Sequence, residues 1–383
     1  MTKSSDTEVP FLDYYRQHQI IPVAQSDRGS TAHLSRRSAL YRQLGVGRSS
    51  IENRKVIEFG PGTGDNAVHI VSLRPSRLVL VDGNPYSIAA LRAKKASGVL
   101  PEFCEIVEST ILDFETTERF DVAICEGTMP GQKSPERFLK HVASFTGDHG
   151  TVITTAIGAL SYLAEICRKA LVPILTEGID AHETKVARCV QFFAPHLTSL
   201  RGMTRSHEDG VLDNLLHPWT KFGLFNGDDA INALADEFHL VGSSPDFLQD
   251  WRWYKEISSS TKRNAEFAVG QYQKWAPYLL DYRVDPGTSL KEITLALTKE
   301  AEKCMLLEAA LPAVPTAESY REFADVLQRI AALLWPHLPG TAKSIDDYLH
   351  GLTALLTLRE MPDFGEFVTW LGRGTQYLSF ERA

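Results

Sequence analysis

The sequence predicts a doubly wound α/β protein, in which helices cover both faces of a mostly parallel sheet. Short continuous apolar runs recur between residues 55 and 156, and helical patterns or loops separate them. Strands buried on both faces require continuous apolar sequence, which these runs provide. The expected strands are 56–59, 78–81, 103–107, 120–125, 151–156, 239–242 and 376–380.

Composition narrows the class of protein. The 383 residues are 43% hydrophobic and 23% charged, which is typical of a globular chain of two domains or of one domain with insertions. A net charge of -8 disfavours a nucleic-acid partner, because phosphates need a basic surface. The five cysteines form no CxxC pair, and no apolar run reaches membrane-spanning length. With a polar N-terminus as well, we expect a cytoplasmic protein that has no membrane partner.

The spacing of the expected strands suggests six segments. Two long intervals interrupt the strand pattern, and we expect both to project beside the carboxyl ends of strands four and five, as a helical cap over a small-molecule pocket. The segments are a helical lead-in or lid over 1–50, a cofactor-binding core over 51–156, a first insertion over 157–227, a core helix and sixth strand over 228–256, a helical insertion over 257–370 and a seventh strand over 371–383.

The most informative motif follows the first expected strand. Gly60, Gly62 and Gly64 stand at alternate positions before a helix, where glycines allow a ligand to approach the backbone. A dinucleotide-binding fingerprint would place its third glycine at Asp65, and here Glu58 also puts an acid inside the strand. The motif therefore differs from that of nicotinamide enzymes.

A second acid, Asp82, ends the second strand, where its carboxylate can accept both hydroxyls of a ribose. Together these features resemble class I S-adenosylmethionine-dependent methyltransferases. The resemblance implies S-adenosyl-L-methionine as cofactor and a Rossmann-like sheet of order 3-2-1-4-5-7-6 with an antiparallel last strand. It also implies these cofactor-binding residues: Glu58, Phe59, Gly60, Pro61, Gly62, Gly64, Asn66, Asp82, Gly83, Asn84, Thr110, Ile111, Glu126 and Gly127.

Candidates for catalysis and acceptor binding lie mostly outside this core. We expect His207 or His33 to act as general base, because neutral imidazole is competent near pH 7, and Glu126 to face the transferred methyl group. Exposed helix faces would explain the same polar clusters without any function. The expected substrate-binding residues are Arg37, Arg205, Asp209 and Arg373. We expect no metal, because only Glu126 offers a ligand near the ends of strands four and five.

The predicted function is methyl transfer from S-adenosylmethionine to an oxygen or nitrogen of a small molecule, such as a metabolite, a sugar or a natural-product intermediate. Two alternatives stay open: a catalytically inert cofactor-binding partner or scaffold protein, and a nicotinamide-dependent oxidoreductase, against which Asp65 argues. We expect a small-molecule substrate as partner and allow for a homodimer.

Overall fold

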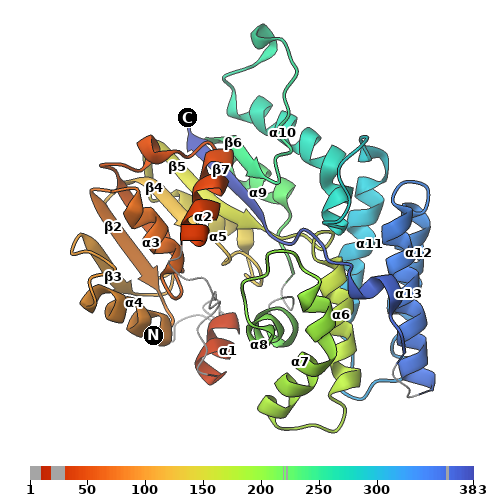
Figure 1. Cartoon of the computed structure of the whole chain (residues 1–383). Helices are drawn as coiled ribbons and strands as arrows, with labels where there is room; N and C mark the ends of the chain where they lie inside the picture. The colour runs from red at the N-terminus through yellow and green to blue at the C-terminus, as the bar shows by residue number, and fades with distance from the viewer. Residues whose placement is uncertain (1–9, 19–30, 219, 221–222, 359–361) are drawn as a thin grey trace, which may run out of the picture. The chain divides into compact units, whose positions relative to one another are not determined.

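The computed structural model describes residues 10–18, 31–218, 220, 223–358 and 362–383; the polar N-terminal stretch and part of the lead-in lie outside this range. The chain divides into two compact units (Figure 1). The sheet unit comprises Met1–Ile157, Leu224–Tyr272 and Thr375–Ala383, and the helical unit comprises Gly158–Gly223 and Gln273–Gly374.

The sheet has the order β3-β2-β1-β4-β5-β7-β6, as predicted. Strands β1 to β5 pair in parallel, and β7 is antiparallel to both of its neighbours. The strands are β1 Lys55–Phe59, β2 Arg77–Asp82, β3 Cys104–Glu108, β4 Phe120–Cys125, β5 Thr146–Ala156, β6 Phe238–Ser244 and β7 Gln376–Arg382. The carboxyl ends of β1, β2 and β4 therefore meet at one edge, where ligands bind in open α/β sheets.

Two boundaries differ by more than two residues from the sequence-based prediction. Strand β5 begins at Thr146 instead of 151, because Thr146 pairs with Phe120 of β4 before a register shift. The sequence pattern does not indicate this start, since residues 146–150 include two glycines and no apolar run. In the segment 228–256, where we expect a core helix followed by the sixth strand, the sequence pattern extends the helix to residue 238, but α9 spans only Gly227–Leu234 and Phe238 already belongs to β6. Its start is specified locally, because Asn226 and Asp229 form a capping box.

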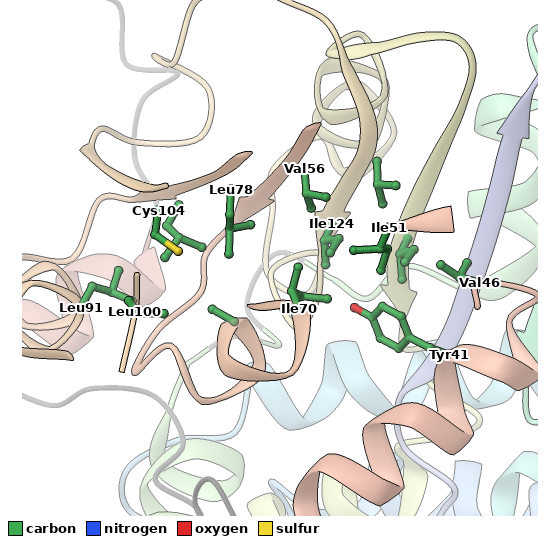
Figure 2. Close-up of a cluster of buried hydrophobic side chains, with 14 of the residues drawn as sticks. Tyr41, Val46, Ile51, Val56, Ile70, Leu78, Leu91, Leu100, Cys104 and Ile124 are labelled. Atoms are coloured by element: carbon green, nitrogen blue, oxygen red, sulfur yellow. The ribbon is translucent and has the colours of Figure 1, made fainter. Parts of the chain in front are cut away.

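One face of the sheet packs against α2 and α3 (Figure 2). Tyr41 of α2 and Ile70 of α3 belong to a buried cluster with Val56, Leu78 and Ile124 of the strands. The helices of the sheet unit are α1 Pro10–His18, α2 Thr31–Gln43, α3 Asp65–Ser72, α4 Pro85–Ala96, α5 Pro135–Ala143 and α9 Gly227–Leu234, and α10 Thr261–Trp275 begins in it. This packing fixes α2 beside the carboxyl ends of the strands.

The helical unit combines both insertions in one body. The buried guanidinium of Arg168 on α6 donates to the carbonyls of Phe367 (3.2 Å) and Trp370 (2.6 Å), and the hydroxyl of Tyr320 donates to the carbonyl of Ala170 (2.6 Å). Buried carbonyls need such donors. The helices are α6 Leu163–Leu175, α7 His182–Thr198, α8 His207–Val211, α11 Lys291–Ala309, α12 Arg321–Leu334 and α13 Pro339–Thr357. No helix in the described part of the chain could cross a bilayer.

Gly242 of β6 offers a test of the packing at the end of α2. A Cβ atom at this position would lie 2.6 Å from the carbonyl carbon of Leu44. The oxygen of the same carbonyl accepts a hydrogen bond from the Ser379 hydroxyl (2.5 Å). We expect Gly242→Ala to destabilise the protein by about 1–3 kcal/mol, because the backbone must shift. Gly270→Ala in helix α10, where the added methyl meets no atom within 4 Å, should be neutral or slightly stabilising. Equal urea midpoints for the two variants would contradict this packing.

Candidate active site

The loop between β1 and α3 holds the three predicted glycines in left-handed backbone. Gly60, Gly62 and Gly64 have φ values of 69°, 56° and 76°. A Cβ on Gly60 would lie 2.6 Å from the Thr128 methyl group, and one on Gly64 would lie 2.5 Å from the Leu91 side chain. Two of the glycines thus also permit close packing inside the chain, a reason that the sequence alone does not reveal.

Asp82 at the end of β2 binds this loop to the start of α4. Its Oδ2 accepts from the Gly62 N–H (3.1 Å), and its Oδ1 accepts from the Asn84 N–H (2.8 Å). The Asn84 side chain in turn caps α4 by accepting from the Tyr86 N–H (3.1 Å). Burial raises the pKa of Asp82 to about 6, although these amide hydrogen bonds oppose the shift. The carboxylate is therefore held in place before any ligand binds.

Glu58 on β1 is a buried carboxyl group whose Oε2 atom has no hydrogen-bond partner among the described residues. Burial, and then the nearby Glu126 carboxylate, raise the pKa of Glu58 to about 8. An unpaired buried carboxylate is costly, and a cation placed beside it would remove most of that cost. Glu58 is thus suited to a positively charged ligand group.

Glu126 follows β4 and lies in a buried ion pair with Arg37 of α2. Arg37 Nη2 is 2.7 Å from both carboxylate oxygens, the Tyr41 hydroxyl donates to Oε1 (3.1 Å), and Asn66 Nδ2 donates to Oε2 (3.4 Å). Burial alone would lower the pKa of Arg37, but the Glu126 charge, the hydroxyls of Tyr41 and Tyr377 and the hydrogen bond to Glu126 together raise that pKa above its ordinary value. The structure thus joins two residues that the sequence analysis assigned to different ligands. The next residue, Gly127, donates its N–H to the Thr155 hydroxyl (2.8 Å), which fixes the turn after β4.

Tyr41 and His69 belong to the same cluster but were missed in the sequence analysis. His69 is fully buried, its Nε2 is 3.1 Å from the Ser38 hydroxyl, and its ring packs edge-on against Tyr41 with centroids 5.0 Å apart. Burial, and then the Arg37 charge, lower the pKa of His69 to about 4, so it is neutral at pH 7. The spacing of four residues between Arg37 and Tyr41 could have indicated a shared helix face, whereas nothing local marks His69.

The remaining cofactor candidates line the same edge. The Thr110 hydroxyl donates to Asp113 (2.7 Å), and His141 donates to the Ile111 carbonyl (2.8 Å), which orders the segment after β3. Arg16 of α1 donates to the Gly83 carbonyl (2.9 Å). Pro61 accepts from the Gly64 N–H (2.9 Å) at its carbonyl, and the Phe59 ring packs edge-on against Phe114 in the core.

The candidate base and substrate residues divide between the two units. His33 is buried on α2, one turn before Arg37, in the sheet unit. In the helical unit, Arg205 pairs with Asp213 (2.8 Å), and His207 Nε2 lies 3.3 Å from the Thr198 hydroxyl.

Asp209 and Arg373, also in the helical unit, make contacts within their own unit. Asp209 donates its backbone N–H to the Ser206 cap (3.0 Å). Arg373 donates to the carbonyls of Tyr278 (3.2 Å) and Val284 (2.6 Å), so its guanidinium already braces the chain. Among the described residues, no three metal-ligating side chains gather at one place.

Residues 57–154 match a protein family described as "Methyltransferase domain". This segment is a class I methyltransferase domain. No curated protein matches the chain.

Several solved structures are similar to part of this chain. NodS, an N-methyltransferase from Bradyrhizobium japonicum in complex with S-adenosyl-l-homocysteine, is 15% identical over 39% of this chain and 74% of its own, with a TM-score of 0.31. The DhpI–SAM–HEP complex is 19% identical over 41% and 69% (TM-score 0.31). CcbJ from Streptomyces caelestis is 20% identical over 33% and 50% (TM-score 0.28). This chain therefore covers between half and three quarters of the length of these proteins.

The cofactor of the methyltransferase domain is S-adenosyl-L-methionine, and the residues at the carboxyl edge fit it. The buried Glu58 carboxyl, whose Oε2 has no hydrogen-bond partner in the described part of the chain, suits a cationic group, and the Gly62 N–H of the glycine loop contacts Asp82. Asp82 keeps acceptor capacity beyond its amide hydrogen bonds, since each carboxylate oxygen has two lone pairs.

Replacing Glu58 by Gln should change how the stability of the cofactor-free protein depends on pH. Because the folded-state pKa lies above the ordinary value, the wild type loses stability as pH rises from about 4.5 through about 8, by at most about 1.4 kcal/mol per pH unit. Glu58→Gln should show a flatter profile and a higher midpoint at pH 8, measured by thermal unfolding. The exposed Glu115→Gln is the control, and parallel profiles for wild type and Glu58→Gln would contradict the assignment.

The ion pair can be tested by a double-mutant cycle. Arg37→Met and Glu126→Leu should each destabilise the protein by about 3–5 kcal/mol, because each leaves a buried charge unpaired. The double variant should cost clearly less than the sum, as measured by urea unfolding. Arg36→Met, on the exposed side of the same helix, should have little effect. Strict additivity would show that the two side chains do not interact.

Proposed function

We propose that this protein transfers a methyl group from S-adenosylmethionine to an oxygen or nitrogen of a small molecule. The observation that carries the proposal is the buried Glu58 carboxyl, whose Oε2 has no hydrogen-bond partner among the described residues, near the glycine loop and Asp82 in a methyltransferase domain. A net charge of -8 supports a small-molecule acceptor over a nucleic acid. The family match favours methyl transfer over the nicotinamide alternative.

The bound cofactor would supply an activated methyl group on a sulfonium centre. The chain's own contribution is alignment and exclusion of water, which account for much of the rate in such displacements. Glu58 would face the cofactor's ammonium group, and Asp82 would accept its ribose hydroxyls. Gly83, Thr110 and Ile111 would lie along the adenine.

A hydroxyl acceptor would also need a proton acceptor. We propose His207 or His33 for this role, with Arg37, Arg205, Asp209 and Arg373 as acceptor-binding candidates. His33 is supported by its place on α2 one turn from the Arg37–Glu126 pair. The ion pair itself supports a positioning role for Glu126 more than proton transfer, because both of its oxygens already accept hydrogen bonds.

Asp82→Ala tests the cofactor site and the function together. It should weaken S-adenosylmethionine binding by about 1–3 kcal/mol, roughly 5- to 150-fold in Kd, because ribose hydroxyls lose their acceptor. Calorimetry measures the affinity, and a mass-shift assay against hydroxyl and amine metabolites measures transfer. Asp121→Ala, at the amino end of β4, is the matched control and should retain both properties.

The outcomes separate the alternatives. Unchanged affinity in Asp82→Ala would contradict the ribose site, if circular dichroism shows that the variant is folded. Tight cofactor binding by the wild type without transfer to any acceptor would favour an inert partner or scaffold protein. A loss of the rising, acidic limb of the pH–rate profile in His33→Ala, but not in His207→Ala, would identify His33 as the base, and the reverse result would identify His207.

A further inference from the structure

The segment between β6 and α10 carries a dense group of exposed aromatic side chains. Within residues 250–257, here called the aromatic loop, Trp251, Trp253, Tyr254 and Ile257 are 94%, 60%, 68% and 54% exposed. Single exposed apolar residues are ordinary, but four within seven positions form a patch that needs an explanation. In Figure 1 the segment between β6 and α10 reaches out beyond the strands of the sheet unit.

The loop is held in this conformation by its own contacts. Arg252 donates three hydrogen bonds to the Asp250 carboxylate (2.6–3.1 Å), and its guanidinium lies 3.7 Å from the centre of the Phe267 ring on α10. The N–H of Glu256 donates to the Trp253 carbonyl (2.8 Å), which closes a turn at the tip. The aromatic rings are therefore presented outward by a fixed scaffold instead of folding back onto the core.

We propose that the aromatic loop docks the protein on the headgroup region of a lipid bilayer. Trp and Tyr combine an apolar ring with a polar N–H or O–H, and for this reason they concentrate where membrane meets water. Lys255 adds a cation whose Nζ lies 4.9 Å from the Trp253 ring and 5.8 Å from the Tyr254 ring, within the range of cation–π attraction. Asp250 neutralises Arg252, and the neighbouring Glu256 offsets Lys255, so the aromatic loop has no net charge.

The small area of the aromatic loop and the blocked edge strand beside it fit a membrane better than a second copy of the chain. An aromatic side chain buries about 150–250 Å² at most, so three of them remain below the roughly 800 Å² per partner of a stable protein interface. The neighbouring edge strand does not extend the surface: Asn264 of α10 bonds to both the N–H and the carbonyl of Leu240 (2.8 and 3.2 Å). These side-chain bonds occupy backbone groups that would otherwise pair with another strand.

A fluid headgroup layer needs no complementary shape, and a small protruding tip can enter it without moving the rest of the sheet unit. The proposal is separate from the proposed function, because none of the cofactor-site residues lies in the aromatic loop. It refines the expectation that a membrane is no partner: no helix of the described chain spans a bilayer, and surface docking requires none.

Cosedimentation of the full chain with phosphatidylcholine vesicles tests the proposal. We expect the wild type to sediment with these vesicles and its tryptophan emission to shift to the blue. The variant Trp251→Ser/Trp253→Ser should bind these vesicles at least about tenfold more weakly than the wild type, because the inserted apolar rings are lost. The matched control is Trp335→Ser, which removes a 47% exposed tryptophan from the end of α12 and should bind as the wild type does. Cofactor binding should be equal in all three proteins and reports that they are folded.

Three results would overturn the proposal. One is a wild type that stays in the supernatant with phosphatidylcholine vesicles and with vesicles that also contain phosphatidylglycerol. Another is undiminished vesicle binding by Trp251→Ser/Trp253→Ser, or wild-type binding that requires phosphatidylglycerol. If the binding that requires phosphatidylglycerol also disappears when salt is added, charge alone explains it. The third is a dimer, seen by sedimentation velocity without lipid, that this double variant dissociates; the loop would then contact a second copy of the chain.

Discussion

The carboxyl edge of the sheet depends on how three buried acids are kept together. Glu58 lies in β1, Asp82 ends the neighbouring β2 and Glu126 follows the neighbouring β4, and the charges of Glu126 and Asp82 both disfavour ionisation of Glu58. Each acid is stabilised in a different way. Asp82 accepts backbone amides, Glu126 pairs with Arg37, and Glu58 is held in its neutral form by burial. A cationic ligand changes this balance, because it favours the ionised form of the one acid without a partner.

This arrangement couples the scaffold to the ligand site. The Arg37–Glu126 pair fastens α2 to the end of β4, while the cluster under α2 packs Tyr41 against the sheet. Breaking this ion pair would therefore alter both the stability of the core and the position of α2, which carries the acceptor-binding candidate Arg37. Asp82 has the same double character, since it shapes the glycine loop and is also the proposed acceptor for the ribose hydroxyls. Sites of this kind lower the stability of the ligand-free protein somewhat, because they hold charged groups in the positions that a ligand requires.

The two insertions illustrate a different constraint. Each supplies amphipathic helices that cannot bury their apolar faces alone, and the structure combines them in one helical unit. Arg168 is central there, because its buried guanidinium supplies donors for carbonyls some 200 residues farther along the chain. A buried guanidinium with no carboxylate at hydrogen-bond distance would strongly destabilise a protein unless backbone carbonyls accepted its hydrogen bonds, as they do here.

The sequence by itself determined the sheet and the cofactor edge of this protein. Strand periodicity, the alternate glycines and the acid at the end of the second strand are local patterns, so the strands and the place of Asp82 could be predicted from them, and the family resemblance that they carry implied the strand order. Only the tertiary structure decided which side chains meet: Arg37 and Glu126 are 89 positions apart, and the isolation of Glu58 depends on everything packed around it. Local patterns report what one segment buries, whereas pairing and desolvation depend on distant segments that packing brings together.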